Sequence, residues 1–341
     1  MAPKIFITGI TGYIAGDAFY ALYQKHPEYE YSALVRTQAK ADAVKKAYPA
    51  VKTVLGGLDD FETLKKAAAE ADVVLHAADA SDHEGAARAI AAGILEGHSK
   101  GRPGFWLHTG GTGILTWEDT KYDRLGEPSE KVYNDWDGIE ELTNLPDEAF
   151  HRNVDKIVLE AGSKHSDVIK SVIVAPPTIY GNGRGPISGR GRQVYELAKL
   201  VLTKQYTPVI GQGQARWNNV HVHDLSDLYV LLTEAAVNGN TNAELWGEKG
   251  YLIVESGEHV WGDLAKSVGQ AAVDLGYLKS ASVRALGKDQ ALDQAGFEAV
   301  SWGLNSRARA QRANKVLGWK ASRNSLEEEV KTIVKTEQER L

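Results

Sequence analysis

A glycine-rich run near the start of the chain is the first pattern in this sequence that could do chemistry. It spans residues 8–16 (TGITGYIAG) and lies between a short apolar stretch and an amphipathic one. Glycines at a strand-to-helix turn let a pyrophosphate approach the N–H groups of the helix start, where the helix dipole favours negative charge. A turn used only for packing is the alternative. Because strand and helix patterns repeat after it, the run predicts a dinucleotide site with contacts from Gly9, Thr11, Gly12, Tyr13 and Ile14.

Arg36 stands at the end of the second apolar run, YSALVR (residues 31–36). In dinucleotide-binding folds an acidic residue at this place accepts hydrogen bonds from the ribose of NAD, whereas a guanidinium pairs with the 2′-phosphate of NADP. The sequence therefore predicts NADP(H) as the cofactor, with Lys40 as a second cation on the same side. An ordinary solvated arginine is the alternative for Arg36.

Short apolar runs alternate with amphipathic stretches through the first half of the chain. The pattern predicts strands over residues 4–8, 31–36, 52–55, 72–77, 105–109 and 168–175, and helices over 13–25, 39–48, 61–69, 84–98 and 147–165. Strands of this length between helices are typical of βαβ units. We therefore predict an α/β protein, a Rossmann doubly wound parallel sheet with a smaller, mostly helical C-terminal substrate region.

The expected dinucleotide-binding domain comprises residues 1–180, and residues 217–245 return to it. Residues 181–216 and 246–341 then form the smaller, substrate-binding region. The polar segment 113–146 interrupts the first domain, and an insertion of that length is typical of a functional lid. Asp147 is the expected N-cap of the helix that follows. The Gly- and Arg-rich stretch 181–192 is expected to be a mobile loop at the edge of the substrate cleft, where its arginines could meet an anionic substrate.

Composition excludes several classes of protein. The chain has 341 residues and no Cys, so disulfides, thiolate nucleophiles and cysteine metal sites are absent. A net charge of −6 gives no general attraction to nucleic acid. No apolar run approaches the roughly 20 residues that span a bilayer, and the N-terminus lacks the pattern of a signal peptide. We expect a cytoplasmic protein without nucleic-acid or membrane partners.

Six short segments are similar, in the same order, to those of one protein family. They are residues 8–16, then GGL (56–58), HAA (76–78), PTIYG (177–181), VHVHD (220–224) and LGW (317–319). Nearly the whole chain thus resembles the short-chain dehydrogenase/reductase superfamily, in its extended and atypical branch of epimerase/dehydratase-like and NmrA-like proteins. The resemblance implies further cofactor contacts from Leu58, Ala77, Ala78, Thr109, Pro176, Thr178 and Ile179.

The resemblance also implies a catalytic set that this chain does not fully keep. The family uses a Tyr four residues before a Lys, in which the Lys binds the nicotinamide ribose and the Tyr phenol moves a proton. Lys156 matches that Lys, but Arg152 stands in the place of the Tyr. An arginine stays protonated and is a poor proton shuttle. Thr109 or Thr112 would supply the hydroxyl that polarises the substrate.

Three residues could replace the missing acid. His151 is adjacent to the vacant place and titrates near neutral pH. Tyr133 could fold over the nicotinamide from the 113–146 insertion, and Tyr180 follows the sixth predicted strand of the main sheet. A capping histidine, a lid aromatic and a packed tyrosine are the corresponding structural alternatives. We favour His151 among the three.

These residues support three hypotheses about function. The first is an NADP-dependent oxidoreductase acting on a small carbonyl or hydroxyl compound. The second is a non-catalytic, redox-sensing NADP-binding protein, and the third an epimerase or dehydratase that retains its cofactor. Trp106, Trp117, Trp136 and Trp217 lie near presumed cleft segments and favour an apolar or aromatic substrate. A homodimer is expected by analogy with the family, and no metal site is expected, because His221 and His223 lack further ligands.

Overall fold

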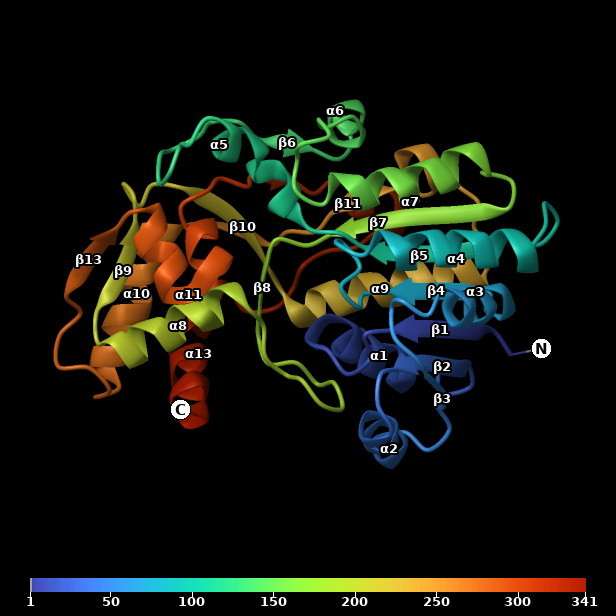
Figure 1. Ribbon diagram of the computed structural model, residues 1–341, viewed down its shortest axis with the longest axis horizontal. Coiled ribbons are helices and arrows are strands. Elements are labelled where there is room, and N and C mark those ends of the chain that lie inside the picture. The colour runs from blue at the N-terminus through green and yellow to red at the C-terminus, as the bar shows by residue number, and fades with distance from the viewer. Residues whose placement is uncertain (1) are drawn as a thin grey trace.

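Seven parallel strands form the central sheet of the computed structural model, which describes residues 2–341 (Figure 1). Their order across the sheet is β11-β7-β5-β4-β1-β2-β3. The order reverses between β1 and β4, the position at which open α/β sheets bind their ligands. In chain order the strands are β1 (Lys4–Thr8), β2 (Glu30–Val35), β3 (Lys52–Leu55), β4 (Val73–His76), β5 (Gly104–Thr109), β7 (Ile169–Ala175) and β11 (Tyr251–Ile253).

Helices cover both faces of this sheet because successive strand residues are apolar. In β1, Ile5 and Ile7 point into one core and Phe6 points into the other. The first core is closed by α1 (Tyr13–Lys25), α2 (Gln38–Ala47) and α9 (Val222–Val237). The second is closed by α3 (Phe61–Glu70), α4 (Glu84–Gly97) and α7 (Arg152–Lys164). Parallel strands that are buried on both faces give continuous apolar runs, so the sequence predicted them well.

A smaller region lies beside the carboxyl ends of these strands, to the left in Figure 1. It contains a three-stranded sheet in the order β12-β10-β8 and the pair β13-β9. A third core, with Trp217, Trp261 and Trp302, lies beneath its helices. Its strands are β8 (Thr178–Tyr180), β9 (Thr207–Ile210), β10 (Arg216–His221), β12 (Gly257–Val260) and β13 (Val283–Leu286), and its helices are α8 (Gln193–Lys204), α10 (Trp261–Asp274), α11 (Lys288–Ser301) and α13 (Leu326–Arg340).

The predicted fold class is confirmed, but two strands lie on the other side of the predicted domain boundaries. β10 was expected in the dinucleotide-binding domain, and it pairs instead with β8 and β12 of the smaller region. β11 was expected in the smaller region, and it pairs with β7 at the edge of the main sheet. A single apolar strand of three to six residues carries no signal for which of two sheets it joins.

The 113–146 insertion is folded and packed rather than an open lid. It contains the 3₁₀ helix η1 (Thr112–Thr116), α5 (Trp117–Lys121), β6 (Tyr133–Asn134) and α6 (Ile139–Thr143). β6 pairs with β14 (Ala308–Arg309), which comes from the C-terminal part of the chain. α12 (Arg312–Leu317) follows β14 and packs on the first core through Ala313.

The helix that carries the candidate catalytic residues begins five residues later than predicted. α7 starts at Arg152, so Asp147 is not its N-cap. His151 holds the N-cap position instead, with a left-handed backbone (φ 68°) and no side-chain capping bond. Asp147 is instead engaged by Lys156, a contact that joins the loop to the second turn of the helix.

Within residues 2–341, no helix combines the length and the apolar character that crossing a bilayer requires.

Candidate active site

The turn between β1 and α1 forms an open cradle. Gly9 has a φ of +85°, and a Cβ there would lie 2.9 Å from the backbone nitrogen of Ala78. Only glycine fits both the conformation and the close approach. At Gly12, the N-cap of α1, the Gly9 oxygen is the only atom of the described residues within 4 Å of an added Cβ. The space before the free N–H groups of α1 is therefore open, as binding of a pyrophosphate requires.

A hydrogen-bond network holds the end of β4 against the turn between β1 and α1. The Thr8 hydroxyl lies 2.7 Å from Nδ1 of His76 and accepts bonds from the backbone N–H groups of Ala77 and Ala78, at 3.2 and 3.3 Å. β4 is thereby held against Gly9. The structure thus brings together three of the predicted cofactor residues, Gly9, Ala77 and Ala78.

Arg36 lies at the end of β2 with its side chain exposed. Among residues 2–341 it forms no salt bridge, so its guanidinium is free to meet an anion. The backbone N–H of Gly56 donates to the Val35 carbonyl at 3.1 Å, which places the segment up to Leu58 beside the same strand end. These positions are compatible with an adenosine site on this side of the sheet.

The loop of residues 181–192 begins against α1, and its last residue, Arg192, pairs with Glu298 of α11 at 2.6 Å. The Tyr13 hydroxyl donates to the Gly181 carbonyl at 2.5 Å. Arg184 binds the buried carboxylate of Asp17 through its backbone N–H, Nε and Nη2, at 2.7 to 2.9 Å. Arg190 is similarly held, by Glu337 and Glu196. These two arginines are therefore not available to an anionic substrate, contrary to the expectation from sequence.

His151 and Asp82 form a hydrogen-bonded pair at the end of β5. Nδ1 of His151 lies 2.6 Å from Oδ1 of Asp82, which belongs to the loop before α4. Burial opposes ionisation of Asp82, but the hydrogen bonds from His151 and Ser81, together with the charges of His151 and Arg192, outweigh it and lower the pKa of this carboxyl. Since the carboxylate accepts from Nδ1–H, the lone pair of a neutral His151 is on Nε2. This Nε2 faces Gly111 and Gly113, where an added Cβ would lie 3.6 and 3.3 Å from it.

The two threonines proposed to polarise the substrate lie in different surroundings. The Thr109 hydroxyl lies 2.5 Å from the Tyr229 hydroxyl of α9, in the first core, so it faces away from the second core and α7. Thr112 is flanked by the two glycines that face His151. Its oxygen accepts from Trp217 Nε1 at 3.2 Å, and because an indole N–H only donates, the Thr112 hydroxyl proton stays available. Of the two, Thr112 is the one placed beside His151.

Lys156 does not reach this site. Its ammonium bonds Asp147 at 2.8 Å, and both side chains are exposed. The residues of α7 that reach the end of β5 are His151 and Asp155, and an added Cβ on Gly110 would lie 3.4 Å from Oδ1 of Asp155. These two residues have the four-residue spacing of the family's Tyr and Lys. The predicted contact of Lys156 with the nicotinamide ribose stays a prediction.

The two tyrosines considered as alternative acids are packed elsewhere. Tyr133 accepts a hydrogen bond from Trp117 Nε1 at 3.0 Å, and its ring lies in the second core. Burial raises its pKa to about 12, so it holds its proton at neutral pH. Tyr180 donates to the Asn324 carbonyl at 2.7 Å. Neither residue forms a lid over His151.

The remaining predicted cofactor residues lie at the strand ends of the cleft. The Pro176 carbonyl accepts from the backbone N–H of Thr112 at 3.1 Å. The Thr178 hydroxyl donates to Gln193 at 2.8 Å, and Ile179 is half-buried beside it. Thr11 and Ile14 flank Gly12 at the start of α1, where both are half-buried.

A group of buried polar side chains lies on the α7 side of the sheet. His76 and His108 are neighbours in register on β4 and β5, and burial lowers the pKa of His76 to about 3. His108, Arg152 and Asp155 each leave at least one buried polar atom without a partner among the described residues. Since such atoms are usually satisfied by ordered water, we expect water molecules between these side chains.

Sequence reasoning missed Asp82 and Asp155. Asp82 lies 69 residues before His151, in a loop with no motif of its own, so only the fold brings the pair together. Asp155 could have been found from its four-residue spacing to His151. His221, by contrast, is simply the N-cap of α9, whose ring accepts from the backbone N–H of His223.

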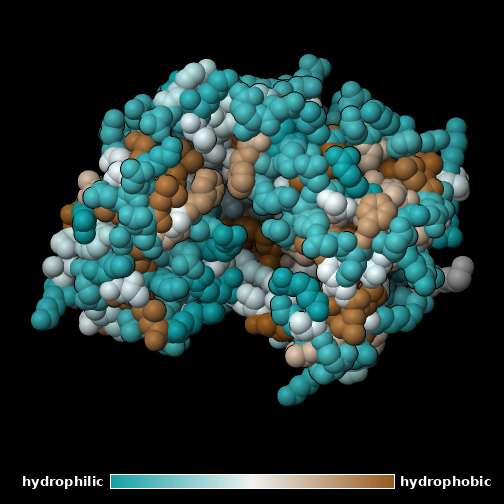
Figure 2. Space-filling model, in the orientation of Figure 1, coloured by the Kyte–Doolittle hydropathy of each residue, from teal (hydrophilic) through white to brown (hydrophobic). Residues whose placement is uncertain are grey.

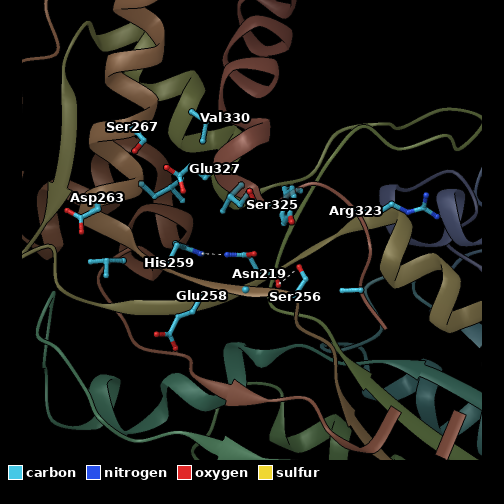
Figure 3. Close-up of a pocket in the computed structure, with 16 residues that line it drawn as sticks. Asn219, Ser256, Glu258, His259, Asp263, Ser267, Arg323, Ser325, Glu327 and Val330 are labelled. Atoms are coloured by element: carbon cyan, nitrogen blue, oxygen red, sulfur yellow. Dashed lines mark hydrogen bonds between the residues drawn. The ribbon is translucent and has the colours of Figure 1, made fainter. Parts of the chain in front are cut away.

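A hollow lies between the two regions. Figure 2 shows this hollow near the middle of the molecule, with hydrophobic side chains in its depth, and comparison with Figure 1 places it between α11 and the strand ends. A separate cavity of about 420 Å³ lies between β12, α10 and the start of α13 (Figure 3). There Asn219 bonds His259 at 3.0 Å, but no residue of the His151 pair lines it.

The sheet order, the glycine turn and the open helix start define a nucleotide-binding α/β fold. A family described as NAD(P)H-binding matches residues 9–100. The chain is 39% identical to the protein named oxidase ucsJ from an Acremonium species, over 100% of this chain and 99% of that protein. It is 26% identical to the uncharacterized protein YLL056C of Saccharomyces cerevisiae, over 96% of this chain and 98% of that protein.

Solved structures agree on the fold. A UDP-glucose 4-epimerase from Thermotoga maritima with UDP-glucose has a TM-score of 0.65 at 16% identity, over 99% of both chains. A dTDP-glucose 4,6-dehydratase from Bacillus anthracis in complex with NAD has a TM-score of 0.66 at 12% identity, over 99% of this chain and 97% of that one. The chain belongs to the same family as the Acremonium protein named oxidase ucsJ, and residues 9–100 form an NAD(P)H-binding segment. The solved structures show that it shares the fold of the epimerase and the dehydratase.

Proposed function

We propose that this protein is an NADP-dependent oxidoreductase that interconverts a small hydroxyl compound and its carbonyl product, with His151 as the proton-transferring residue. The observation that carries the proposal is the His151–Asp82 pair, which aims an imidazole nitrogen at the end of β5. The name of the relative from Acremonium, an oxidase, supports chemistry of this type.

The residues of this chain can carry out the proton transfer between the substrate hydroxyl and the protein. In the oxidative direction, Nε2 of His151 accepts the substrate hydroxyl proton, and Asp82 stabilises the imidazolium that results. The Thr112 hydroxyl donates a hydrogen bond to the same substrate oxygen. In the reverse direction Nε2–H returns the proton to the carbonyl oxygen. The bound coenzyme supplies the other half of the chemistry, by accepting or giving a hydride at its nicotinamide ring.

The coenzyme would be held by the parts of the cradle described above. The N–H groups at the start of α1, beyond Gly12, bind the pyrophosphate. Arg36 pairs with the 2′-phosphate, which favours NADP over NAD. His151 takes over the acid and base role of the family's Tyr. Catalysis is therefore compatible with Arg152 at the position where the family has that Tyr.

His151→Ala tests this proposal, with His165→Ala at the opposite end of α7 as the matched control. Both variants and the wild type are assayed for NADPH formation or consumption with a panel of alcohols, aldehydes and ketones. We expect kcat to fall by about 10²- to 10⁴-fold in His151→Ala and to stay unchanged in the control. The affinity for NADPH should be the same in all three proteins.

Asp82→Asn tests the positioning role of the carboxylate, with Asp79→Asn in the same loop as control. Loss of the negative charge disfavours the imidazolium, so the acid limb of the oxidative pH–rate profile should move to lower pH, and kcat should fall by at least about tenfold. Tight NADPH binding without turnover of any compound of the panel would contradict the proposal. It would favour the non-catalytic, redox-sensing role instead.

A further inference from the structure

A small apolar pocket lies beside the candidate active site. It has a volume of about 120 Å³ and lies between the segment 119–125 and α11. Its apolar wall is formed by five side chains: Leu125, Leu292, Phe297, Val300 and Leu304. An apolar cavity of roughly 150 Å³ lined by such side chains accepts a benzene molecule. This pocket therefore has room for one ring or a short branched chain.

Two phenylalanines connect the pocket to His151. The ring of Phe150 lies 3.7 Å from the His151 ring, measured between centroids. The same Phe150 ring lies 5.3 Å from that of Phe297, which lines the pocket. Phe150 precedes α7, and Phe297 belongs to α11 of the smaller region. The rings of Phe150 and Phe297 thus form a continuous apolar surface between the His151 imidazole and the pocket.

The ring surfaces of this path are exposed in the protein alone. Phe150 is 42% exposed, Phe297 51% and Leu292 44%. Large apolar side chains gathered around a cleft mark a place where a ligand covers them, because each gains free energy when it leaves water.

The polar groups around the pocket are already engaged. Asp119 accepts bonds from the backbone and side-chain nitrogens of Asn305, at 2.6 and 2.8 Å. Asp123 pairs with Lys288 at 3.2 Å. Arg124, the other cation of the lining, lies 4.0 Å from Glu118 and 4.9 Å from the centroid of the Tyr122 ring. All four charged side chains of the lining thus already have a partner in the protein. The lining favours an uncharged, apolar occupant.

The backbone of α11 is interrupted at the residue before Phe297. Gly296 has a φ of +61° and a ψ of −149°, a conformation that residues with a side chain rarely adopt. The break turns the helix direction between Leu292 and Phe297. Both side chains consequently line the same pocket, although they lie on different sides of the break.

We propose that this pocket binds the apolar end of the substrate, a single aromatic or alicyclic ring or a branched aliphatic group attached to the carbon whose hydroxyl gives its proton to His151. The proposal rests on the proposed function for the identity of the reacting group. It specifies the substrate class as uncharged alcohols that carry one ring or a branched aliphatic group, and the corresponding carbonyl compounds.

Binding of benzyl alcohol to the full-length protein with NADP⁺ present tests this inference, with ethanol and glycerol as comparison probes. We measure binding by ligand-observed NMR, and turnover by NADPH formation. Phe297→Ala should weaken benzyl alcohol binding by about tenfold or more, since it removes a large apolar contact. Phe297→Leu should restore part of it. Phe61→Ala is the matched control, because Phe61 is 41% exposed and lies on α3, outside the pocket lining.

The outcomes separate this inference from the proposed function. If benzyl alcohol binding depends on Phe297 and persists in His151→Ala, the pocket assignment stands even when no compound is turned over. If alcohols are oxidised but Phe297→Ala binds and oxidises benzyl alcohol like the wild type, the pocket assignment is wrong and the proposed function stands. A variant that changes only the sedimentation behaviour, and not benzyl alcohol binding, would show a protein interface and overturn the inference.

Discussion

His151 has a backbone conformation that few residues with a side chain adopt. Its φ of 68° lies in the left-handed region, which costs a non-glycine residue roughly 1 kcal/mol or more. The bond to Asp82 and the ring contact with Phe150 hold it there. Because the strained conformation turns the imidazole back toward the end of β5, it is part of the geometry that the proposed proton transfer requires.

The proposed preference for NADP rests on a single exposed side chain, Arg36, which follows β2. We predict that Arg36→Glu weakens NADPH binding by at least about tenfold and strengthens NADH binding, because the carboxylate repels the 2′-phosphate and accepts from ribose hydroxyls. Isothermal titration with both coenzymes measures this. Lys45→Glu, an equal charge change on α2, is the control and should shift both affinities little. An unchanged preference in Arg36→Glu would show that Arg36 is an ordinary surface residue.

Residues whose type is required by the backbone conformation could be predicted from the sequence. Residues whose role depends on a contact with a residue far away in the sequence could not. Gly9 and Gly12 were found because a positive φ and an open helix start leave a glycine signature in the sequence. Asp82 and the orientation of Lys156 were not, because a loop carboxylate and a helix lysine look alike in solvent and in a site. Their environments are set by tertiary contacts alone.

At the scale of elements, the loop 181–192 and α1 form one unit. The Asp17 carboxylate is fully buried, and burial opposes its ionisation. The bonds from Arg184 and Ser226 outweigh burial and lower the pKa of Asp17. A depressed pKa means that this stabilisation is present at neutral pH and is lost as the pH falls through the folded-state pKa.

We predict that Arg184→Ala lowers the free energy of unfolding at pH 7 by about 1–3 kcal/mol, because it leaves the buried carboxylate of Asp17 without its main partner. Urea denaturation measures this change. Arg192→Ala is the control from the same loop, since Arg192 is 80% exposed in its ion pair with Glu298 and should cost less than about 0.5 kcal/mol. The difference between the two variants should shrink below pH 4. Equal effects in both variants at pH 7 would contradict this account.

Whether a segment is a helix or a strand could be predicted from the sequence. Which other segment it contacts could not. The period of the apolar residues predicted the helix 13–25 at its observed ends. The start of α7 was misplaced because Asp147 has the chemistry of an N-cap, yet it bonds Lys156. The insertion 113–146 was taken for a lid because β6 is two residues long and is stable only through its pairing with β14.

At the scale of the whole molecule, Asp155 ties α7 to the last strand of the main sheet. Tyr251 of β11 donates to Oδ2 of Asp155 at 3.0 Å. Burial nevertheless raises the pKa of Asp155 to about 6, above its ordinary 3.8. A raised carboxyl pKa stabilises the folded state below the unfolded-state value, and this contribution is lost as the pH rises through about 6.

We predict that Asp155→Asn removes this pH dependence, since an amide cannot ionise. Relative to the wild type, the variant should gain about 2–3 kcal/mol of unfolding free energy between pH 4 and pH 8. Denaturant titrations at both pH values measure the gain. Asp42→Asn on the exposed face of α2 is the control and should show no such change. A pH-independent difference between Asp155→Asn and the wild type would contradict the assignment.

The first core is closed by residues from both ends of the chain. Trp319 lies in that core with Ala313 and Leu252, and its indole N–H donates to the Asp224 carbonyl at 2.9 Å. Residues as far along the chain as Trp319 must therefore leave the ribosome before the coenzyme-binding half can reach its final packing. Until then the nascent chain exposes apolar strands, to which chaperones can bind during synthesis.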